Sequence, residues 1–398
     1  MSNSIENAIT IIERGVADLI PRADLLKKLV RSAKREEPLR IKLGIDPSAP
    51  HLTLGHSVPL RKMRDLQRLG HTAVLVVGDF TRLIGDPSEK TSTRARMSAE
   101  QIKENLATYE TQLFKILDPH KTEIRYNSEW LTPLTFTDVI EITSKYTVAR
   151  MLERNDFSQR FAANNPISIL EFLYPLAQAY DSVAIRADIE LGGTDQKFNF
   201  LVGRDIQRAY GQEPQVILTV PLLIGTDGVH SMSQSRGNYI GIDEAPGEIF
   251  GKVMSIPDEL MESYFTYLTD ILYQEVTNLH PRQRKQRLAF TLVEMYHDQE
   301  AAQHAQEEFD RIFAQRNRPT EVTQVKLDRA LLDEKGTIWV VNLLMATGLI
   351  ESRSAARRLI DQRGVSINDE RITSFDLNIQ FAPPLFIKVG KRSFVEII

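Results

Sequence analysis

The chain has 398 residues and a formal net charge of -4, with 42% hydrophobic and 26% charged residues. This length exceeds what one hydrophobic core usually supports, so we expect two or three domains. No uncharged apolar run approaches the roughly 18 residues that cross a bilayer, which argues against membrane insertion. Cysteine is absent, which excludes disulfides and thiolate metal sites and favours a cytoplasmic protein without a tightly bound metal.

The N-terminal residues carry a helical pattern. Ile5, Ile9, Ile12, Val16 and Leu19 recur at the spacing of one helix face. A signal peptide instead begins with basic residues and continues as an apolar block. We therefore predict a surface helix at this end of the chain.

Three apolar segments predict the strands of a parallel sheet. Ile41–Ile45, Ala73–Val77 and Val216–Leu223 are rich in β-branched and aliphatic residues and are separated by helical patterns. Ligands of such sheets bind at the carboxyl ends of the strands. The stretch from about 125 to 180 is mostly helical and interrupts the alternation, so we interpret it as an insertion.

A short motif, Thr53-Leu54-Gly55-His56, lies between the first strand and a helix predicted from about Gly55. Backbone N–H groups and the helix dipole favour an anion there. Gly55 lets a nucleotide approach the backbone closely, and His56 is suited to donate to a phosphate oxygen. The alternative is a helix start that is merely capped by Thr53.

Three polar side chains share one face of a second predicted helix. Tyr174, Gln178 and Asp181 stand at i, i+4 and i+7. Polar groups on such a face need hydrogen-bond partners. Those partners are either a ligand or other side chains of the fold, and the spacing leaves both open.

The C-terminal third differs from the rest of the chain. Residues 246–315 carry a helical pattern throughout and predict an all-helical domain, and residues 319–335 are polar with weak periodicity. From residue 337 onward there are eight Lys or Arg against six Asp or Glu. Two strand signals, Gly364–Asp369 and Leu385–Gly390, follow a short helix whose arginines suit phosphate contacts, a solvated basic helix being the alternative. These arginines are Arg353, Arg357 and Arg358.

These segments, in this order, resemble the bacterial-type tyrosyl-tRNA synthetases. Residues 44–56 are similar to the HIGH region of that family, with Thr53 in place of its first histidine. The resemblance implies a multidomain α/β protein whose parts are a Rossmann-like parallel-sheet catalytic domain with a helical insertion, a helical anticodon-recognition domain, a linker and a small α/β RNA-binding module. The ranges implied for these four parts are 1–243, with the insertion near 125–180, then 244–318, 319–336 and 337–398.

The resemblance also implies roles for single residues. Tyrosine binding is implied for Asp46, Asp86, Tyr174, Gln178, Asp181 and Gln196. ATP binding is implied for Gly55, Gly193, Asp195, Leu223, Met232 and Ser233. Catalytic roles are implied for Thr53, His56, Lys90, Arg94, Ser231 and Gln234. The stretch Leu191–Gln196 reads as a Gly-Gly turn followed by a carboxylate, for which a plain surface turn is the alternative.

One motif departs from the family pattern. Gly225–Asn238 is similar to the KMSKS loop, but Ser231 and Gln234 stand where its two lysines belong. The lysines are implied to neutralise the departing pyrophosphate. A charge-assisted contact is worth about 1.5–3 kcal/mol, so losing two lowers the rate by about 10²–10⁴ if nothing compensates. Four candidates for compensation are His230, Arg236, Lys90 and Arg94.

The implied activity is that of a tyrosine–tRNA ligase, which forms tyrosyl-adenylate from tyrosine and Mg-ATP and transfers tyrosine to the 3′ end of tRNA(Tyr), releasing AMP and diphosphate. Implied partners are L-tyrosine, ATP with its Mg²⁺, tRNA(Tyr) and a second copy of the chain bound through the insertion. One alternative is an activation-impaired relative that acts as an RNA-binding or regulatory protein. Others are an enzyme with a non-tRNA acceptor and a tryptophan-specific relative, which Asp181 disfavours because indole carries no hydroxyl at that point.

Overall fold

The computed structural model describes residues 2–46, 51–85, 108–313, 322–350, 352–390 and 393–398. The chain divides into two compact units, residues 1–302 and residues 303–398. The boundary falls inside helix α14 (Gln299–Phe313). Each unit contains its own clusters of buried apolar residues.

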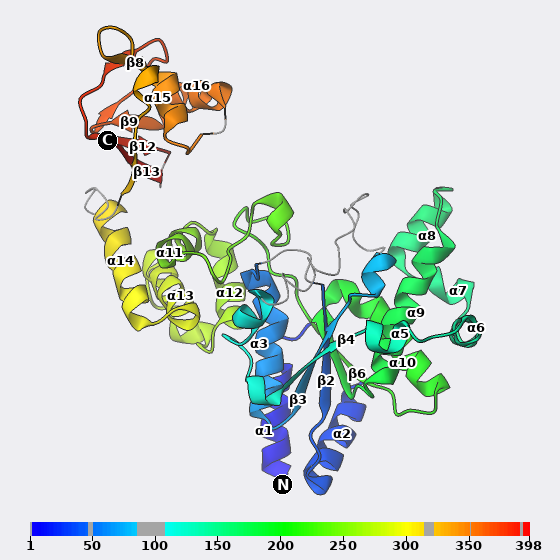
Figure 1. The fold of residues 1–398 in the computed structure, drawn as a ribbon. Helices are drawn as coiled ribbons and strands as arrows, with labels where there is room; N and C mark the ends of the chain where they lie inside the picture. Colours follow the sequence, from blue (N-terminus) through cyan, green and yellow to red (C-terminus); the bar gives the residue numbers. More distant parts are fainter. Residues whose placement is uncertain (1, 47–50, 86–107, 314–321, 351, 391–392) are drawn as a thin grey trace. The chain divides into compact units, whose positions relative to one another are not determined.

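A six-stranded sheet forms the centre of the first unit (Figure 1). Five strands run parallel, and the short edge strand β1 pairs antiparallel with β6. The parallel sheet is therefore confirmed, and the three predicted strands correspond to β2, β3 and β6. In spatial order the strands are β1 (Asp18–Ile20), β6 (Val216–Val220), β5 (Ile189–Gly193), β2 (Arg40–Ile45), β3 (Thr72–Val77) and β4 (Thr122–Tyr126).

Two expectations about this sheet are corrected. The interpretation of Gly192-Gly193 as a turn is wrong, because Gly193 ends β5 and pairs with Val220 of β6. The insertion begins later than residue 125, because Arg125 and Tyr126 complete β4 beside β3. The helices of the insertion start at residue 128.

The sheet has a topological switch point between β5 and β2. From β2 the chain adds β3 and β4 on one side, and from β5 it adds β6 on the other. Ile45 lies beside Val77, and Gly193 lies beside Val220, so these strands end at one edge. Open α/β sheets bind their ligands in the crevice outside the carboxyl ends at such a point.

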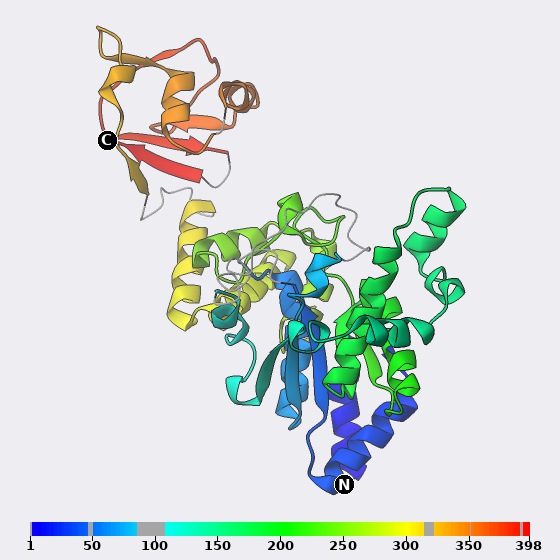
Figure 2. The ribbon, with the colours of Figure 1, turned by 45° about the vertical axis from the view of Figure 1, so that its right-hand side comes forward.

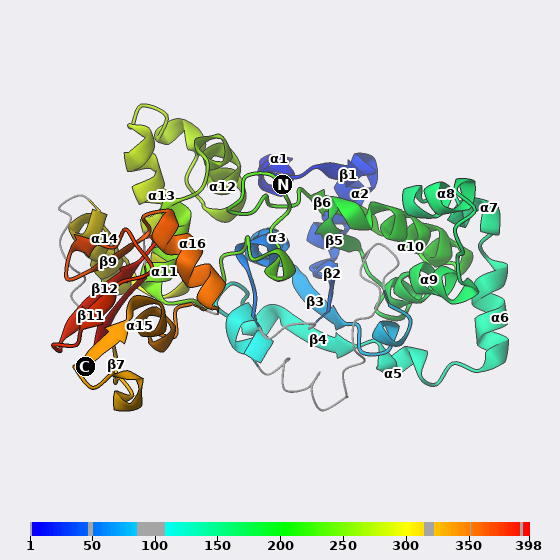
Figure 3. The same ribbon diagram turned by 90° about the horizontal axis from the view of Figure 1, so that it is seen from above.

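Helices cover both faces of the sheet (Figures 1 and 3). Helix α3 (Leu54–Arg68) packs against β2, β3 and β5, whereas α10 (Lys197–Ala209) packs against β5 and β6. Helix α9 (Ile169–Ala184) lies against α10 through an apolar cluster that includes Leu176 and Val202. The insertion helices gather beside α9 and α10, as the teal and green ribbons of Figure 2 show.

The remaining helices of the first unit surround this layered core. The described residues from 246 to 313 contain helices and no strand, as predicted for this region. The helices are α1 (Ser2–Glu13), α2 (Arg22–Arg35), α5 (Ser128–Leu131), α6 (Phe136–Ser144), α7 (Val148–Met151), α8 (Asn155–Ala162), α11 (Pro246–Met254), α12 (Met261–Leu268) and α13 (Pro281–Tyr296).

The second unit is a small α/β fold. Its five-stranded sheet has the order β10-β9-β12-β13-β7, and β11 pairs with β8 in a separate two-stranded sheet. The predicted strand signals correspond to β9 and β12. The elements are β7 (Thr323–Val325), β8 (Thr337–Trp339), α15 (Val340–Ala346), α16 (Arg353–Asp361), β9 (Val365–Ile367), β10 (Glu370–Arg371), β11 (Asn378–Gln380), β12 (Leu385–Val389) and β13 (Ser393–Ile397).

Part of the expected linker belongs to this second sheet. Residues 323–325 form β7, which pairs in parallel with β13. The stretch from 319 to 336 is therefore not a linker throughout. Its polar composition hid the strand, because β7 is an exposed edge strand that needs few apolar residues.

Two kinds of feature are absent from the described residues. No helix among them is long and apolar enough to cross a membrane. No group of three or more His, Asp or Glu side chains in the described part of the chain is arranged to hold a metal ion.

Candidate active site at the carboxyl ends of the strands

The first motif forms the N-terminus of α3, which follows β2 in the chain. Thr53 is the N-cap residue and forms a capping box with His56. The Thr53 N–H donates to His56 Nδ1 at 3.1 Å. Because Nδ1 accepts, the neutral ring carries its proton on Nε2, and the residue is exposed. His56 therefore presents an N–H donor where the helix dipole favours an anion.

Thr53 is buried beside His56. It is 1% exposed, and its hydroxyl lies 3.0 Å from His56 Nδ1. The Thr53 hydroxyl therefore helps to hold the His56 ring, and the catalytic role expected for Thr53 stays a prediction.

Helix α9 carries Tyr174, Gln178 and Asp181 within one helix, as predicted. Asp181 is 4% exposed and accepts a hydrogen bond from Trp130 Nε1 at 2.8 Å and a longer one from Asn127 Nδ2 at 3.5 Å. Burial raises the pKa of Asp181 to about 6, against the lowering effects of the nearby Lys42 and of these two donors.

The carboxylate of Asp181 is thus satisfied in part by the fold. An ionised carboxylate offers about four lone-pair sites, and two donors leave capacity for a further hydroxyl. Of the two alternatives that the sequence left open, the structure shows the first in part: neighbouring side chains hold Asp181, and its remaining lone pairs leave it able to accept from a ligand.

A buried ion pair lies between α9 and the sheet. Lys42 of β2 and Glu190 of β5 are 0% and 1% exposed, and Lys42 Nζ lies 2.8 Å from Glu190 Oε1. The same ammonium donates to the Gln178 carbonyl and to the Ser182 hydroxyl, each at 2.8 Å. The pair therefore ties the helix of Asp181 to the two strands at the switch point.

Asn199 links two of the predicted tyrosine-binding residues. Its Nδ2 donates to Gln178 Oε1 at 2.9 Å and to Gln196 Oε1 at 3.1 Å. Asn199 is 3% exposed, and Arg154 Nη1 donates to its Oδ1 at 3.4 Å. This amide brings the two glutamines together across α9 and α10.

The ends of β5 and β2 carry further predicted residues. A Cβ at Gly193 would stand 2.3 Å from Asp195 Oδ1 and 2.9 Å from Leu222 Cδ2, so a larger residue does not fit there. Asp46 follows β2 and accepts from Arg82 Nη1 at 3.2 Å. Three other predicted site residues lie outside the described residues, namely Asp86, Lys90 and Arg94.

The second motif forms a loop that rests on the first. The Met232 N–H donates to the Leu223 carbonyl at 2.7 Å. The Met232 Cβ is 3.5 Å from where a Cβ on Gly55 would stand. Gln234 Nε2 donates to the His51 carbonyl at 2.8 Å, and the Ser233 N–H donates to Asn238 Oδ1 at 2.8 Å. The structure therefore brings the predicted ATP-binding residues of both motifs together.

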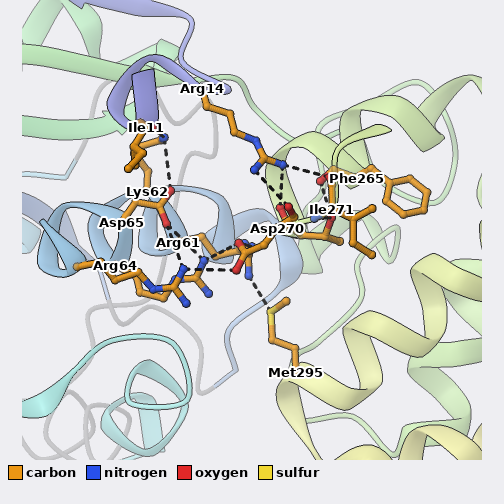
Figure 4. A network of polar contacts seen from close by, with 12 residues as sticks. Ile11, Arg14, Arg61, Lys62, Arg64, Asp65, Phe265, Asp270, Ile271 and Met295 are labelled. Atoms are coloured by element: carbon orange, nitrogen blue, oxygen red, sulfur yellow. Dashed lines mark hydrogen bonds and ion pairs between the residues drawn. The ribbon is translucent and has the colours of Figure 1, made fainter. Parts of the chain in front are cut away.

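Arginines of α3, the helix of the first motif, connect it to the residues that follow α12 (Figure 4). Arg61 and Arg64 of α3 donate to Asp270 Oδ1 at 2.6 and 2.9 Å. Arg14 donates to the Ile271 carbonyl at 3.1 Å. Because Asp270 and Ile271 follow α12, this network fixes α3 against the helical region of the first unit.

The basic residues predicted for RNA binding lie on α16 of the second unit. Arg353, Arg357 and Arg358 are exposed. The Arg357 guanidinium lies 5.4 Å from the centre of the Trp339 ring and 5.3 Å from that of Phe375. These rings fix the orientation of one of the three arginines.

Several residues that shape the site gave no clear signal in the sequence. They reach the predicted residues from elements distant in the chain, so spacing along one helix cannot find them. Trp130 carried the best signal, because an indole N–H that is partly buried usually has an acceptor. The four residues are Lys42, Asn127, Trp130 and Asn199.

Comparison with known proteins identifies the class. Residues 34–314 match the family model described as tRNA synthetases class I (W and Y), and residues 338–377 match that of the S4 domain. The chain belongs to the class I tRNA synthetases of the tryptophan and tyrosine type. The resemblance drawn from the motifs and the predicted fold class are both confirmed.

Two relatives that are each 49% identical to this chain are tyrosine–tRNA ligases. The tyrosine–tRNA ligase of Carboxydothermus hydrogenoformans is 49% identical over 408 residues, which cover 100% of this chain and 98% of the relative. That of Aquifex aeolicus is also 49% identical and covers 99% of each chain. Both matches span the whole chain, including the second unit.

Solved structures agree on the fold. A C-terminally truncated mitochondrial tyrosyl-tRNA synthetase of Aspergillus nidulans superposes with a TM-score of 0.63 at 21% identity, covering 78% of this chain and 99% of that one. The tyrosyl-tRNA synthetase of Archaeoglobus fulgidus, complexed with L-tyrosine, gives 0.61 at 22% identity and covers 76% and 99%.

Proposed function

We propose that the chain is a tyrosine–tRNA ligase, which activates L-tyrosine with ATP and transfers it to the 3′ end of tRNA(Tyr). The observation that carries the proposal is the buried, partly satisfied carboxylate of Asp181 in a chain that matches tyrosine ligases over its full length. A phenol hydroxyl completes the hydrogen bonds of this carboxylate. Phenylalanine leaves them incomplete, and an unsatisfied buried polar group costs about 1–3 kcal/mol.

Further contacts with tyrosine belong to the proposal. Tyr174 and Gln178 lie two turns and one turn before Asp181 on α9, and Asn199 links Gln178 to Gln196. The substrate's ammonium calls for an anion within hydrogen-bond distance. The family pattern gives that role to Asp86, which lies outside the described residues. Asp46, directly after β2, is a second proposed contact with tyrosine.

The first step joins the two substrates. An oxygen of the tyrosine carboxylate forms a bond to the α-phosphorus of ATP, the bond from that phosphorus to the bridging oxygen breaks, and diphosphate leaves with the electron pair. Mg²⁺ enters with ATP. No side chain has to act as a nucleophile, because the protein positions the reactants and neutralises charge.

The proposed ATP contacts come from both motifs and from the end of β5. His56 donates to a phosphate at the N-terminus of α3, and Gly55 and Gly193 admit the nucleotide close to the backbone. Asp195 accepts from the ribose hydroxyls. The loop contacts are Leu223, Met232 and Ser233. In the second step a ribose hydroxyl of the terminal tRNA adenosine forms a bond to the tyrosyl carbonyl carbon and loses its proton, the bond from that carbon to the phosphate oxygen breaks, and AMP leaves with the electron pair.

We assign tRNA recognition to the remaining parts of the chain. The helical region over 244–318 is the proposed anticodon-recognition part. The S4 domain match and the exposed Arg353, Arg357 and Arg358 of α16 support RNA binding by the second unit. Arginine suits phosphate contacts because its planar fork presents several donors at once.

We assign the insertion to a homodimer interface. Its helices and the start of α9 expose large apolar side chains, with Phe136 and Ile169 each 80% exposed. Clustered exposed apolar side chains mark association surfaces. The other exposed apolar side chains of this region are Ile140, Val148, Phe161 and Leu170.

A second candidate function rests on one observation. Ser231 and Gln234 replace both lysines of the KMSKS loop, and Gln234 instead hydrogen-bonds the His51 carbonyl. A chain impaired in activation would retain the tyrosine pocket and tRNA binding and act as an RNA-binding or regulatory protein. A Ser231→Lys, Gln234→Lys double variant would then activate tyrosine far faster than the unmodified chain.

One pair of assays separates the two candidates. Tyrosine-dependent ATP–pyrophosphate exchange measures activation, and attachment of labelled tyrosine to tRNA measures the full reaction. The ligase proposal expects both in the unmodified chain. Tight tRNA binding with neither exchange nor attachment would establish the regulatory alternative instead.

A further inference from the structure

The loop over Gly225–Asn238 contains few charged side chains. Asp227 is its acid, and His230 and Arg236 are its basic residues. Departing diphosphate carries several negative charges, so a loop beside it needs positive charge in the transition state. The structure shows which basic side chain is available for that task.

His230 is committed to Asp227. Its Nδ1 lies 3.1 Å from Asp227 Oδ2. Backbone N–H groups of Val229 and His230 donate to Asp227 Oδ1 at 3.1 Å, and Asn238 Nδ2 donates to Oδ2 at 3.1 Å. The hydrogen bond from the Val229 N–H contributes most to lowering the pKa of Asp227, and the other hydrogen bonds add to it. Together they lower this pKa to about 2, although burial opposes the shift. The carboxylate therefore stays ionised and balances any charge on His230.

Arg236 makes a different set of contacts. Its Nη1 donates to the Ser231 hydroxyl at 3.1 Å and to the Ser231 carbonyl at 3.3 Å. The described residues place no carboxylate within ion-pair distance of it, and the residue is exposed. The guanidinium thus folds back over position 231, where the family pattern has its first lysine.

Two neighbours of Arg236 in this loop contact the first motif or the residues just before it. Met232, the residue after Ser231, packs on Gly55 at the N-terminus of α3. Gln234, two residues further along, donates a hydrogen bond to the His51 carbonyl. Serine at position 231 accepts from the arginine, whereas a lysine there would repel it. Ser231 and Gln234, the two residues that replace the family's lysines, therefore both leave room for the positive charge of Arg236.

We infer that Arg236 is the catalytic residue of this loop that neutralises the departing diphosphate, in place of the absent lysines. This inference rests on the proposed function and names the group that contacts the β- and γ-phosphates. Arg236 gains and loses no proton, because a guanidinium stays charged. Its contacts form most strongly as the bond between the α-phosphorus and the bridging oxygen breaks.

The test is tyrosine-dependent pyrophosphate exchange in four proteins: the unmodified chain, Arg236→Gln, Ser231→Lys and the combined variant. Arg236→Gln should lower kcat about 10- to 100-fold with an unchanged KM for tyrosine. Ser231→Lys should restore most of that loss in the combined variant, yet raise kcat only slightly when Arg236 is present. This dependence of one substitution on the other is what a shared task predicts.

Arg208→Gln is the matched control. Arg208 is an exposed arginine of α10 whose Nη1 lies 2.9 Å from Asp205 Oδ1, and its loss should leave exchange unchanged. Equal exchange by Arg236→Gln and Arg208→Gln overturns the inference, as does a loss that Ser231→Lys fails to restore, since that result points to a structural role. If the unmodified chain shows neither exchange nor tRNA charging, the proposed function itself fails and the inference fails with it.

Discussion

At the scale of single residues, the proposed contact between Asp181 and tyrosine sets two requirements for one carboxylate. It must be buried to reject an amino acid that lacks a hydroxyl, and it must be ionised to accept well from one that has it. Burial raises its pKa to about 6, and the charge of Lys42 and the N–H of Trp130 oppose that rise. Trp130 is therefore a positioning residue that helps Lys42 to keep Asp181 charged near neutral pH.

Activity should depend on this protonation. The pKa of about 6 lies above the ordinary value of 3.8, so Asp181 takes up its proton as the pH falls through 6, and kcat/KM for tyrosine should fall there. Trp130→Phe removes a donor that favours the ionised form, which raises the pKa further. The acid limb of the pH profile of kcat/KM should then move to higher pH by roughly one unit.

The other tryptophan of the chain supplies the control for this profile. Trp339 lies in the second unit, where its Nε1 donates to the Phe375 carbonyl at 2.5 Å. Trp339→Phe should leave the acid limb in place. An unmoved limb in Trp130→Phe would show that the indole does not tune Asp181.

Residue-scale prediction from sequence succeeded where one helix carries the pattern. Tyr174, Gln178 and Asp181 share α9, so their spacing was enough to group them. Lys42 gave no such signal, since a lysine in an apolar strand does not reveal Glu190, its partner 148 positions later. The burial of Thr53 beside His56 was not predicted, because the sequence shows its hydroxyl but not what surrounds it.

At the scale of elements, α9 depends on the strands beneath it. Lys42 and Glu190 belong to β2 and β5, and Lys42 donates to the Gln178 carbonyl. A buried ion pair is weak evidence for net stability, but breaking it leaves an uncompensated charge. The pair therefore serves to fix the position of α9 over the switch point.

Substitution of one partner should destabilise the first unit strongly. Glu190→Gln leaves the Lys42 ammonium buried without its counter-ion, at a cost of about 3–5 kcal/mol in the free energy of unfolding. Combining it with Lys42→Met removes the buried charge and should recover a large part of that loss. Urea unfolding of the two variants measures both values. Equal stability of the single variant and the unmodified chain would contradict the role given to the pair.

Element-scale prediction depended on composition. β2 and β3 are apolar and were predicted to within one residue at their starts. β4 was missed because this edge strand alternates charged residues, Glu123 and Arg125, with other side chains. β5 was missed because it contains Glu190 and ends in two glycines, a pattern that usually indicates a turn.

At the scale of the whole molecule, the insertion should hold two copies of the chain together. Phe161 of α8 is 65% exposed, and Phe161→Glu would place a charge in the proposed interface. Burying an unpaired charge is costly, so the dimer dissociation constant from sedimentation velocity should rise at least about 10-fold. Leu26→Glu, at a 42% exposed position of α2, is the control. Identical sedimentation of the unmodified chain and the two variants would show that the insertion is not the dimer interface.

The most direct measurement of the central claim is the selectivity of activation, taken as kcat/KM for pyrophosphate exchange with tyrosine and with phenylalanine. The unmodified chain should strongly prefer tyrosine. Asp181→Asn should lower the value for tyrosine at least about 10-fold and leave that for phenylalanine nearly unchanged. Equal acceptance of the two amino acids by the unmodified chain, or an undiminished preference in Asp181→Asn, would contradict the assignment of this pocket.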